Sequence, residues 1–539
     1  MRWLLTSLFI YVAFHLEAQN LNESTVDFHN PKLYLLNWHN KDLRSDQIPG
    51  IALDKAYQKV LDSKKSRRVV VAVIDSGVDI YHEDLEGKIW QNVDEIPGNQ
   101  IDDDNNGFVD DVNGWNFLGN SDGDNIDFET YEITRMYRQY TDKVDNTLFP
   151  GDRDYDLYLK VRKDYFSKLN QAKRDRNNLN DFIQNYDFYK RYLQGYLRKH
   201  DFNLAEVKRI KPTDTALRKA KDFWVYVNAS GLTPEVIERL QEKNYSTLNY
   251  HLNPDFDPRE MIMGDDIKDV SDLGYGNNDV VGSRPEHGTH VAGIIAAVRD
   301  NGIGVNGIVE NVQIMPLRII PNGDERDKDV ANAIRYAVDN GASVINMSFS
   351  KDYSPYKVAV DQAVKYAELN NVLIVHGAGN ASRDLDFDSI YPNRVYSDAT
   401  VADNWLTVGA STIDLNVNLA ATFSNYGRRS VDIFAPGVDI YSLEPNNSYG
   451  LQSGTSMASP VVAGVAAMLM SYYPELTLNQ VKRIILNSYS NHQKLKVFLP
   501  GQDKKLCRFK RLSKSGGVIN AYRAVVMAER ATQDLNSAP

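Results

Sequence analysis

Short apolar runs alternate with amphipathic stretches along much of this chain, and the two patterns predict different elements. Residues 69–74 (VVVAVI) are apolar throughout and rich in β-branched side chains, which is typical of a strand buried on both faces. Three later runs, at 313–320, 343–349 and 372–375, predict strands in the same way. Strands of this kind occur in the interior of parallel sheets, where helices cover both faces.

Amphipathic stretches fill the intervals between these runs. Residues 327–340 place Val330, Ile334 and Val338 on one face, and Gly341 follows the last turn, so this stretch is predicted to be a helix with a glycine C-cap. The alternation predicts an α/β fold, with a mostly parallel sheet and helices on both faces. Further helices are expected at 355–370, 460–472, 477–488 and 518–531, and residues 532–539 are expected to form a frayed tail.

Residues 127–264 follow a third pattern. They are rich in Tyr, Lys, Arg, Asp and Asn, and apolar and aromatic residues recur at helical spacing between Leu179 and Tyr196. Thr233 followed by Pro234 is typical of the first positions of another helix. The region is therefore predicted to be a helical hairpin or small bundle inserted into the α/β domain. Two roles remain open for it, a lid or packing element and a docking surface for a partner.

The first residues have the pattern of a secretory signal. Arg2 precedes an apolar stretch at 3–16 and the small residue Ala18 follows, so residues 1–18 are predicted to be a cleaved signal peptide. The stretch is shorter than the roughly 20 residues of a membrane-spanning helix, and no other run is as apolar, so the mature chain is expected not to span a membrane. The protein is thus predicted to be exported, either secreted or periplasmic, with residues 19–68 as an N-terminal extension.

Composition narrows the function classes. The net charge of −11 argues against nucleic acid and anionic membranes as partners. Cys507 is the one cysteine, so no intramolecular disulfide can form, and stability must come from the core with or without bound metal ions. The basic run at 64–68 (KKSRR) is open to two interpretations, a processing site and a solvated lead-in to the first strand.

Four separate motifs carry groups suited to nucleophilic catalysis. Ser456, within the sequence GTSMASP, opens an apolar helical run, where unpaired N–H groups and the helix dipole favour a developing oxyanion. A serine hydroxyl needs a neighbouring base, and His287, within HGTHVAG, opens another helical run. Asp75 and Asn380 each lie at or just beyond the end of a predicted strand, at the sheet edge where functional groups gather in α/β folds. Each motif alone also has an ordinary interpretation as a helix cap or a turn.

In the chain order Asp, His, Asn, Ser, the four motifs together resemble those of the subtilisin-like serine peptidases, the subtilases. The resemblance implies that Ser456 is the nucleophile, His287 the general base and Asp75 the carboxylate that orients the base. It also implies that Asn380 donates to the oxyanion. The expected protein is an exported serine endopeptidase acting on proteins or peptides. The alternatives are a catalytically silent binding protein on the same scaffold and a processing peptidase whose insertion selects one partner.

The resemblance also implies the domain layout. Asp75 and His287 lie 212 residues apart, far more than in subtilases of simple architecture. The helical region 127–264 accounts for the excess, so a subtilisin-like three-layer fold is expected to comprise 69–126 and 265–531.

The expected substrate contacts follow from the same resemblance. Residues 346–350 (NMSFS) are similar to the family strand that pairs with the substrate backbone. Ser350 stands where the family usually has a glycine, so its side chain is expected to narrow the primary pocket or to change its polarity. The expected substrate-binding residues are Ser348, Phe349, Ser350, Gly377 and Gly379.

An acidic loop predicts a calcium site. Asp102, Asp104 and Asn106 supply oxygen ligands at alternate positions and Gly107 follows at the turn, as in the first half of an EF-hand loop. The glutamate that ends such a loop is replaced by Asn113, so a solvated turn is the alternative. The expected ligands are Asp102, Asp104, Asn106, the Phe108 carbonyl and Asp110, and no organic cofactor is expected.

A glycine-rich loop at 302–307 (GIGVNG) fits a dinucleotide-binding pattern. It follows a helix instead of a strand, so no dinucleotide is expected there. In subtilases the corresponding loop often binds calcium, for which Asp300 and Asn301 are the candidate ligands here.

Overall fold

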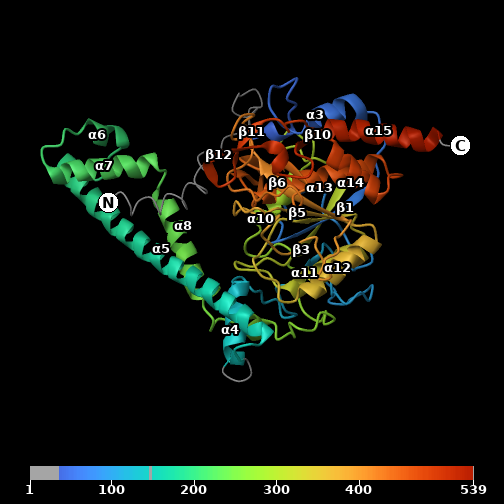
Figure 1. The fold of residues 1–539 in the computed structure, drawn as a ribbon, viewed down its shortest axis with the longest axis horizontal. Helices are drawn as coiled ribbons and strands as arrows, with labels where there is room; N and C mark the ends of the chain where they lie inside the picture. The colour runs from blue at the N-terminus through green and yellow to red at the C-terminus, as the bar shows by residue number, and fades with distance from the viewer. Residues whose placement is uncertain (1–35, 145–148, 538–539) are drawn as a thin grey trace. The chain divides into compact units, whose positions relative to one another are not determined.

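The computed structural model describes residues 36–144 and 149–537, so the predicted signal peptide lies outside the described residues. The described chain divides into two compact units (Figure 1). One comprises residues 128–257, and the other comprises the rest, before and after it in the sequence.

The larger unit is built on a nine-stranded sheet in the order β10-β13-β7-β6-β5-β4-β1-β3-β2. Every neighbouring pair is parallel except β10 and β13, so the predicted α/β fold with a mostly parallel sheet is confirmed. The strands are β1 (Val69–Asp75), β2 (Trp115–Asn116), β3 (Val312–Arg318), β4 (Val344–Met347), β5 (Leu373–Gly377), β6 (Trp405–Ser411), β7 (Ile433–Pro436), β10 (Tyr489–Ser490) and β13 (Val518–Ile519).

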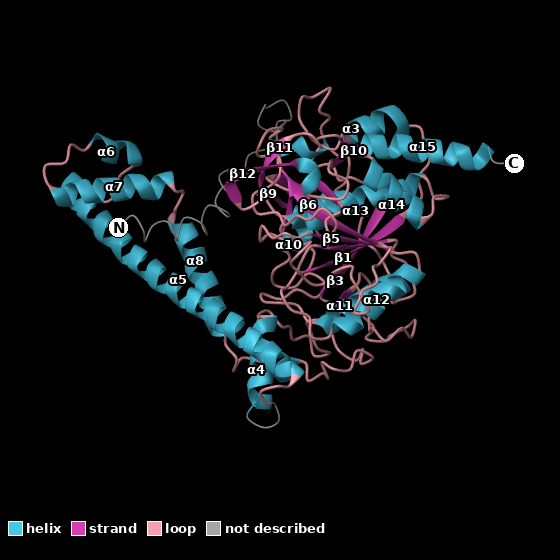
Figure 2. Ribbon diagram, in the orientation of Figure 1, coloured by secondary structure: helices cyan, strands magenta, loops and turns pink. Residues whose placement is uncertain are grey.

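Helices cover both faces of this sheet (Figure 2). Side chains of β1 alternate between the two layers: Val71 and Val73 belong to one core cluster, and Ala72 and Ile74 belong to the other. This explains why the strand is apolar at every position. The first cluster includes residues of α10 (Glu286–Ala296), α13 (Thr455–Tyr472), α14 (Leu478–Asn487) and α15 (Ala521–Ser537), and the second includes α11 (Asp327–Asp339) and α12 (Lys357–Leu369).

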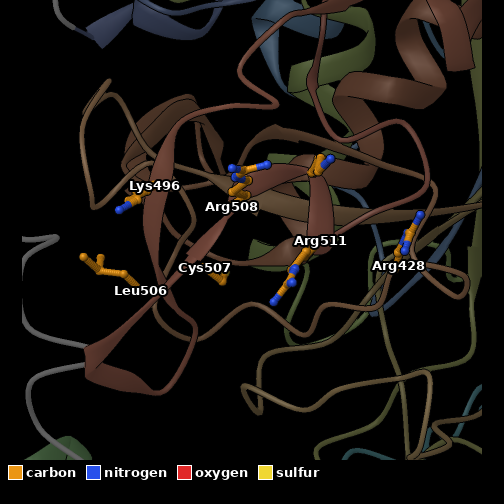
Figure 3. Close-up of a pocket in the computed structure, with 7 residues that line it drawn as sticks. Arg428, Lys496, Leu506, Cys507, Arg508 and Arg511 are labelled. Carbon is orange, nitrogen blue, oxygen red and sulfur yellow. The ribbon is translucent and has the colours of Figure 1, made fainter.

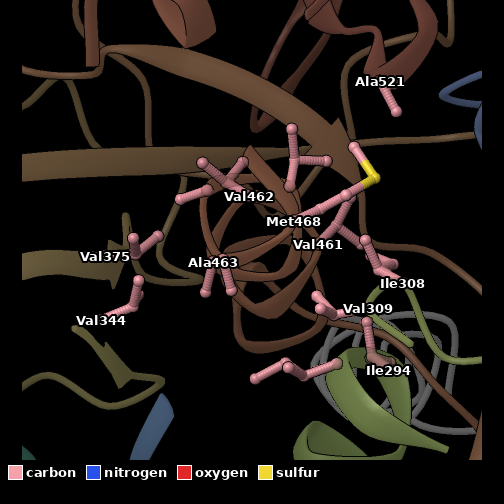
Figure 4. Packing of buried hydrophobic residues seen from close by; sticks show 14 of the residues in the cluster. Ile294, Ile308, Val309, Val344, Val375, Val461, Val462, Ala463, Met468 and Ala521 are labelled. Carbon is pink, nitrogen blue, oxygen red and sulfur yellow. The ribbon is translucent and has the colours of Figure 1, made fainter. Parts of the chain in front are cut away.

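The helix α13 is the centre of the first cluster. Figure 4 shows Val461, Val462 and Met468 of this helix packed among side chains such as Ile294 and Val375. Among the described helices it is the one long and apolar enough to cross a membrane, and 94% of its apolar window is buried inside the fold. Such burial is what a core helix requires.

The start of α13 differs from the prediction. The sequence placed it at Pro460, but the helix begins five residues earlier, at Thr455. Proline has no N–H to donate to the carbonyl four residues before it, which is that of Ser456. The Ser348 hydroxyl donates to this carbonyl instead, at 2.9 Å, so the helix continues through the proline.

The end of the chain also differs from the prediction. Residues 518–531 were expected to be one helix, but Val518 and Ile519 form β13 beside β7 and β10. The helix α15 begins only at Ala521 and runs to Ser537, through most of the predicted tail.

The segment that precedes β1 is packed into the larger unit. Trp38, Leu53 and Leu61 are buried in the same cluster as α13. Arg67 donates its backbone N–H to the Ser471 carbonyl, and the Ser471 hydroxyl donates back to the Arg67 carbonyl. These contacts favour the lead-in interpretation of the basic run at 64–68. The short helices here are Trp38–Asn40, Leu53–Ala56 (α3) and Tyr57–Leu61.

The smaller unit is helical and has an aromatic core of its own. Tyr186 and Tyr189 of its long helix pack against Trp224 and Phe223, with ring centroids 5.2 and 4.9 Å apart. Much of the predicted aromatic stripe is therefore core. The helices are α4 (Glu132–Val144), α5 (Arg153–Leu197), α6 (Leu204–Arg209), α7 (Thr215–Ala229), α8 (Pro234–Ser246) and the π-helical turn Thr247–His251.

The larger unit also contains two 3-10 helices, Glu83–Leu85 and Phe509–Arg511, and three further elements. These three are the helix α9 (Pro258–Ile262), the hairpin of β8 (Ile440–Glu444) and β9 (Ser448–Gln452), and the hairpin of β11 (Lys496–Leu499) and β12 (Gln502–Arg508).

Candidate active site

Asp75 and His287 meet at the carboxyl end of β1. The Nδ1 atom of His287, at the start of α10, lies 2.7 Å from Oδ1 of Asp75, which also accepts the backbone N–H of Ser76. The Asp75 side chain is 2% exposed and that of His287 is 37% exposed. A hydrogen bond from Nδ1–H to the carboxylate leaves Nε2 as the acceptor nitrogen of a neutral ring.

Two glycines permit this close approach of helix and turn. A Cβ atom on Gly288 would lie 2.1 Å from the carbonyl oxygen of Gly77, and one on Gly77 would lie 2.1 Å from the carbonyl oxygen of Val281. Gly288, directly after His287, and Gly77, two residues after Asp75, therefore have no room for a side chain.

The surroundings of His287 favour its charged form. Burial lowers its pKa, but the charge and hydrogen bond of Asp75 and the charge of Glu444 raise it, so that the pKa of His287 lies above its ordinary value. An imidazole with this bias is well suited to accept a proton.

Ser456 is the second residue of α13 and is almost fully buried. Its hydroxyl donates to the Ser348 carbonyl at 3.0 Å. Among the described contacts no hydrogen bond joins Ser456 to His287. The serine thus adopts an orientation in which its proton is held by the neighbouring strand end.

Asn380 is held in one orientation by the residue before the serine. Its Oδ1 accepts both the backbone N–H and the hydroxyl of Thr455, at 2.9 and 3.0 Å. Its Nδ2 therefore points away from Thr455. A Cβ atom placed on Gly454 would lie 3.3 Å from this Nδ2 and 3.6 Å from the Ser456 hydroxyl, so both groups face the same point beside Gly454. The sequence had not suggested a positioning role for Thr455, although it lies within the serine motif.

The expected substrate residues fall into two groups. Ser348 is buried, and its hydroxyl contacts the Ser456 carbonyl and the Asn346 amide, so the side chain supports the serine. Ser350 is exposed, and its hydroxyl lies 3.3 Å from where a Cβ on Gly379 would be. Phe349 is partly buried and its carbonyl contacts His376, whereas Gly377 packs against Thr455.

Two side chains that sequence reasoning missed also contact this glycine segment. The same Cβ position on Gly379 lies 2.7 Å from Nδ2 of Asn425 and 3.4 Å from Cδ1 of Ile390. Ile390 is 7% exposed. Neither residue belongs to a motif of the sequence, because both come from loops that only the folded chain brings here.

The acidic loop brings together a set of carboxylates that differs from the predicted one. Oxygen atoms of Glu95, Asp104 and Asp111 lie within 4.8 Å of one another. Glu95 is 6% exposed, and its Oε2 has no hydrogen-bond partner. Burial raises the pKa of both Glu95 and Asp111. Such a cluster has the chemistry of a site for a hard cation.

The other predicted calcium ligands have different environments. Both oxygens of Asp110 accept backbone N–H groups of residues 98–100, and both oxygens of Asp102 accept those of Asn106 and Gly107. The Asn106 amide donates to Asp104 and Asp111, and so lies at the cluster. The Phe108 ring is buried against Tyr336, with ring centroids 4.9 Å apart.

The glycine-rich loop at 302–307 lies beside another buried carboxylate, that of Asp84. Its Oδ1 accepts the Asn301 amide at 2.7 Å and its Oδ2 accepts the Val305 N–H at 3.1 Å. Asp300 contacts Asn306 instead. No sequence motif points to Asp84, which is more than two hundred residues away from Asn301 in the chain.

Known proteins and a family model are similar in sequence to this chain. A model of the subtilase family matches residues 66–505. Subtilisin DY of Bacillus licheniformis is 37% identical over 207 residues, which are 38% of this chain and 70% of that protein. Thermitase of Thermoactinomyces vulgaris is 40% identical over 186 residues, 34% of this chain and 61% of that protein. A thermophilic serine proteinase of Bacillus sp. (strain AK1) is 42% identical over 186 residues, 34% of this chain and 42% of that protein.

Proposed function

This chain belongs to the subtilase family and is a subtilisin-like serine peptidase, and on that premise we propose that it cleaves peptide bonds through Asp75, His287 and Ser456. The observation that carries the proposal is the 2.7 Å contact between buried Asp75 and His287, at the same sheet edge as the start of α13. The carboxylate fixes the ring so that its acceptor nitrogen is available to a hydroxyl.

The first step needs a small rearrangement of the serine. In the described orientation the Ser456 hydroxyl donates to Ser348, so rotation about its Cα–Cβ bond must redirect the proton to Nε2 of His287. Ser456 Oγ then forms a bond to the substrate carbonyl carbon as His287 takes the proton, and His287 later returns it to the leaving amine. Water completes the cycle by hydrolysing the acyl-enzyme.

The oxyanion of the tetrahedral intermediate would be held by two N–H donors. One is the backbone N–H of Ser456, in the first turn of α13, where N–H groups have no partner within the helix. The other is Nδ2 of Asn380, which Thr455 orients through the opposite end of the amide. Donors fixed before the reaction stabilise the developing charge without reorganising, and in enzymes this contribution is usually the largest one.

We further propose that the pocket for the residue before the scissile bond is shallow. Ser350 and Ile390 both lie against Gly379, on the segment that leads to Asn380. Their side chains occupy space that a large substrate side chain would need, so small residues should be preferred at that position. Substrate backbone would pair with residues 348–350, which directly follow the end of β4.

Calcium is proposed as a structural ion of the acidic loop. Glu95, Asp104 and Asp111 would hold it, together with the Asn106 side chain once its amide oxygen faces the ion. The unpartnered Oε2 of Glu95 fits such a role, because a buried carboxylate oxygen without a donor is costly. The ion would stabilise the loop and take no part in the reaction.

The proposal also covers the location of the protein and the role of the helical insertion. The signal-like sequence of residues 1–18 supports a secreted or periplasmic protein, and a cell wall-associated protease of Bacillus subtilis is 37% identical over 219 residues, 40% of this chain and 23% of that protein. The aromatic core of residues 128–257 favours a packing or lid role for this region over partner docking.

A fluorophosphonate probe tests the proposed nucleophile. The reagent forms a covalent bond to an activated serine, and tryptic peptides should carry the adduct on Ser456. The Ser456→Ala variant, checked for native circular dichroism, should not be labelled. A well-folded wild-type protein without the adduct would instead favour the silent binding protein.

A further inference from the structure

A basic cavity lies on the β11–β12 hairpin, on segments other than those that supply the catalytic residues. Its volume is about 560 Å³, and it is lined by five cationic side chains together with Leu506 and Cys507. Figure 3 shows that these residues come from both hairpin strands, from the turn after β12 and from the loop before β7. The cationic side chains are those of Arg428, Lys496, Arg508, Lys510 and Arg511.

The charge of this cavity is not balanced by the protein. No acidic residue lines it, and among the described residues no ion pair or hydrogen bond joins any of the five cationic side chains to another group of the chain. Two carboxylates of nearby sequence segments pair with other arginines, Asp386 with Arg429 and Asp432 with Arg394. This local excess of positive charge occurs in a chain whose net charge is −11.

The strand register places two of these cations directly opposite each other. Lys496 of β11 is the register partner of Arg508 of β12 in an antiparallel pair. Like charges at opposed positions destabilise a hairpin, because their side chains share one face at close range. A structure that keeps such a pair gains stability when an anion lies between them.

The hairpin that carries the cavity packs on a buried hydrophobic cluster. Val497, Phe509 and Leu512 are fully buried in a core cluster below the hairpin, and the Phe509 ring lies 5.1 Å from that of Phe434. The backbone that carries the cations is therefore fixed before any ligand arrives, which lowers the entropic cost of binding.

From these observations we propose that the β11–β12 cavity binds a phosphate or sulfate group. Arginine presents a planar fork of donors that matches the oxygens of such groups, and three of the five cations are arginines. The volume falls in the range of roughly 300–1,000 Å³ that small-molecule sites have, so an ester has room as well as a free ion. In an ester, the organic part would lie against Leu506 and Cys507.

The proposal is tested by calorimetric titration of the full-length Ser456→Ala protein, which avoids autolysis. The probes are inorganic phosphate, glucose 6-phosphate and glucose 6-sulfate, at constant ionic strength set with sodium chloride. We expect saturable binding with a dissociation constant of about 1 mM or lower. Tighter binding of the esters than of free phosphate identifies a sugar ester as the ligand class, and the reverse order identifies the free ion.

A matched pair of variants separates a built site from diffuse charge. Arg508→Gln with Arg511→Gln removes two lining cations, whereas Lys504→Gln with Lys505→Gln removes two exposed cations of the same hairpin that do not line the cavity. The first pair should weaken binding at least about tenfold and the second less than about threefold. The single variant Arg508→Gln should also raise the melting temperature in chloride, because it removes the opposed like charge, and the gain should vanish in phosphate.

Three results would overturn the assignment. The first is no saturation by about 10 mM of any probe. The second is an equal loss of affinity in the two double variants. The third is a tetraglutamate peptide that binds more tightly than every phosphate and sulfate probe, which would make the surface a site for acidic peptides. None of these results bears on labelling of Ser456, so failure here and failure of the proposed peptidase activity are distinguishable.

Discussion

The candidate triad around Asp75 and the acidic loop around Glu95 and Asp104 both bury carboxylates, but the negative charge is compensated in different ways at the two places. Asp75 faces His287, a ring that can become a cation, and accepts a backbone N–H as well. The carboxylates of Glu95, Asp104 and Asp111 face one another, and the groups that donate to them are N–H groups of the backbone and of asparagines and one tyrosine hydroxyl.

Under our proposals, the first site carries its own compensating group, whereas the second would gain one from a bound ion. In the proposed mechanism, protonation of His287 would be stabilised by the charge of Asp75, which is already in place. Among the described contacts, no cationic side chain lies at the carboxylates of the acidic loop, so a bound cation would relieve their mutual repulsion. Loss of the ion should therefore affect stability, whereas changes at the triad should affect the rate of reaction.

The largest effect is expected for Ser456→Ala. Peptide hydrolysis should fall to the background rate, because no other group of the site can form the acyl-enzyme. The melting temperature should change little, since the variant removes one hydroxyl and no core volume. Hydrolysis of unfolded casein and differential scanning calorimetry measure the two outcomes. If the repurified Ser456→Ala protein still hydrolysed casein although the fluorophosphonate probe does not label position 456, the assignment of Ser456 as the nucleophile would be wrong.

The next effect is expected for Asn380→Ala. Loss of one oxyanion donor should lower kcat by roughly 10²–10³-fold, equivalent to about 2.7–4 kcal/mol, with KM nearly unchanged. Steady-state kinetics on a peptide anilide measure both constants. Thr455→Val is an informative companion, because it retains the backbone donor to Oδ1 and removes the hydroxyl donor, so its loss should be smaller. Near-full turnover of Asn380→Ala would mean that the oxyanion lies elsewhere.

We expect calcium to change the melting temperature of the protein through the acidic loop, independently of the catalytic residues. An ion that binds the folded state alone stabilises it by about 2.7 kcal/mol at a hundredfold excess over its dissociation constant. Chelation of the Ser456→Ala protein should therefore lower its melting temperature, measured by calorimetry. In calcium, Glu95→Gln and Asp104→Ala should each melt lower than the parent protein and be indifferent to chelator.

The melting temperature of Glu95→Gln in the absence of calcium distinguishes an ion site from a solvated turn more clearly than the measurements in calcium do. Removing one of three facing negative charges should then raise the melting temperature above that of the chelated parent protein. Asp110→Asn is the control, because its carboxylate binds backbone N–H groups away from the cluster and should destabilise with or without calcium. Melting curves of metal-free and calcium-loaded parent protein that coincide would leave residues 102–111 as a solvated turn.

The sequence predicted what depends on local pattern. The strand at 69–74 was identifiable because its side chains alternate between two buried layers, so every position is apolar. The partners of long-range contacts had no such pattern. Glu95 and Asp111 lie outside the EF-hand spacing, and Ile390 reaches Gly379 from a loop without a motif. The early start of α13 depends on Ser348, which replaces the N–H that Pro460 lacks.

The smallest effect is expected at Glu444, which tests whether charge beyond the Asp75 contact influences the base. Burial lowers the pKa of His287, but Asp75 and then Glu444 raise it above its ordinary value. The neutral ring is the active form, so kcat/KM should rise with pH as His287 loses its proton, on a limb displaced to higher pH than for a free histidine. Glu444→Gln keeps the side-chain shape and its contact to Gln452 but removes the charge, so the limb should move to lower pH.

The plateau of kcat/KM above the limb should stay within about twofold, because the neutral base and the oxyanion donors are unchanged. High salt should reduce the shift, as it does for partly exposed charges. Superimposable pH profiles of Glu444→Gln and the parent enzyme at low ionic strength would assign the bias of His287 to Asp75 alone.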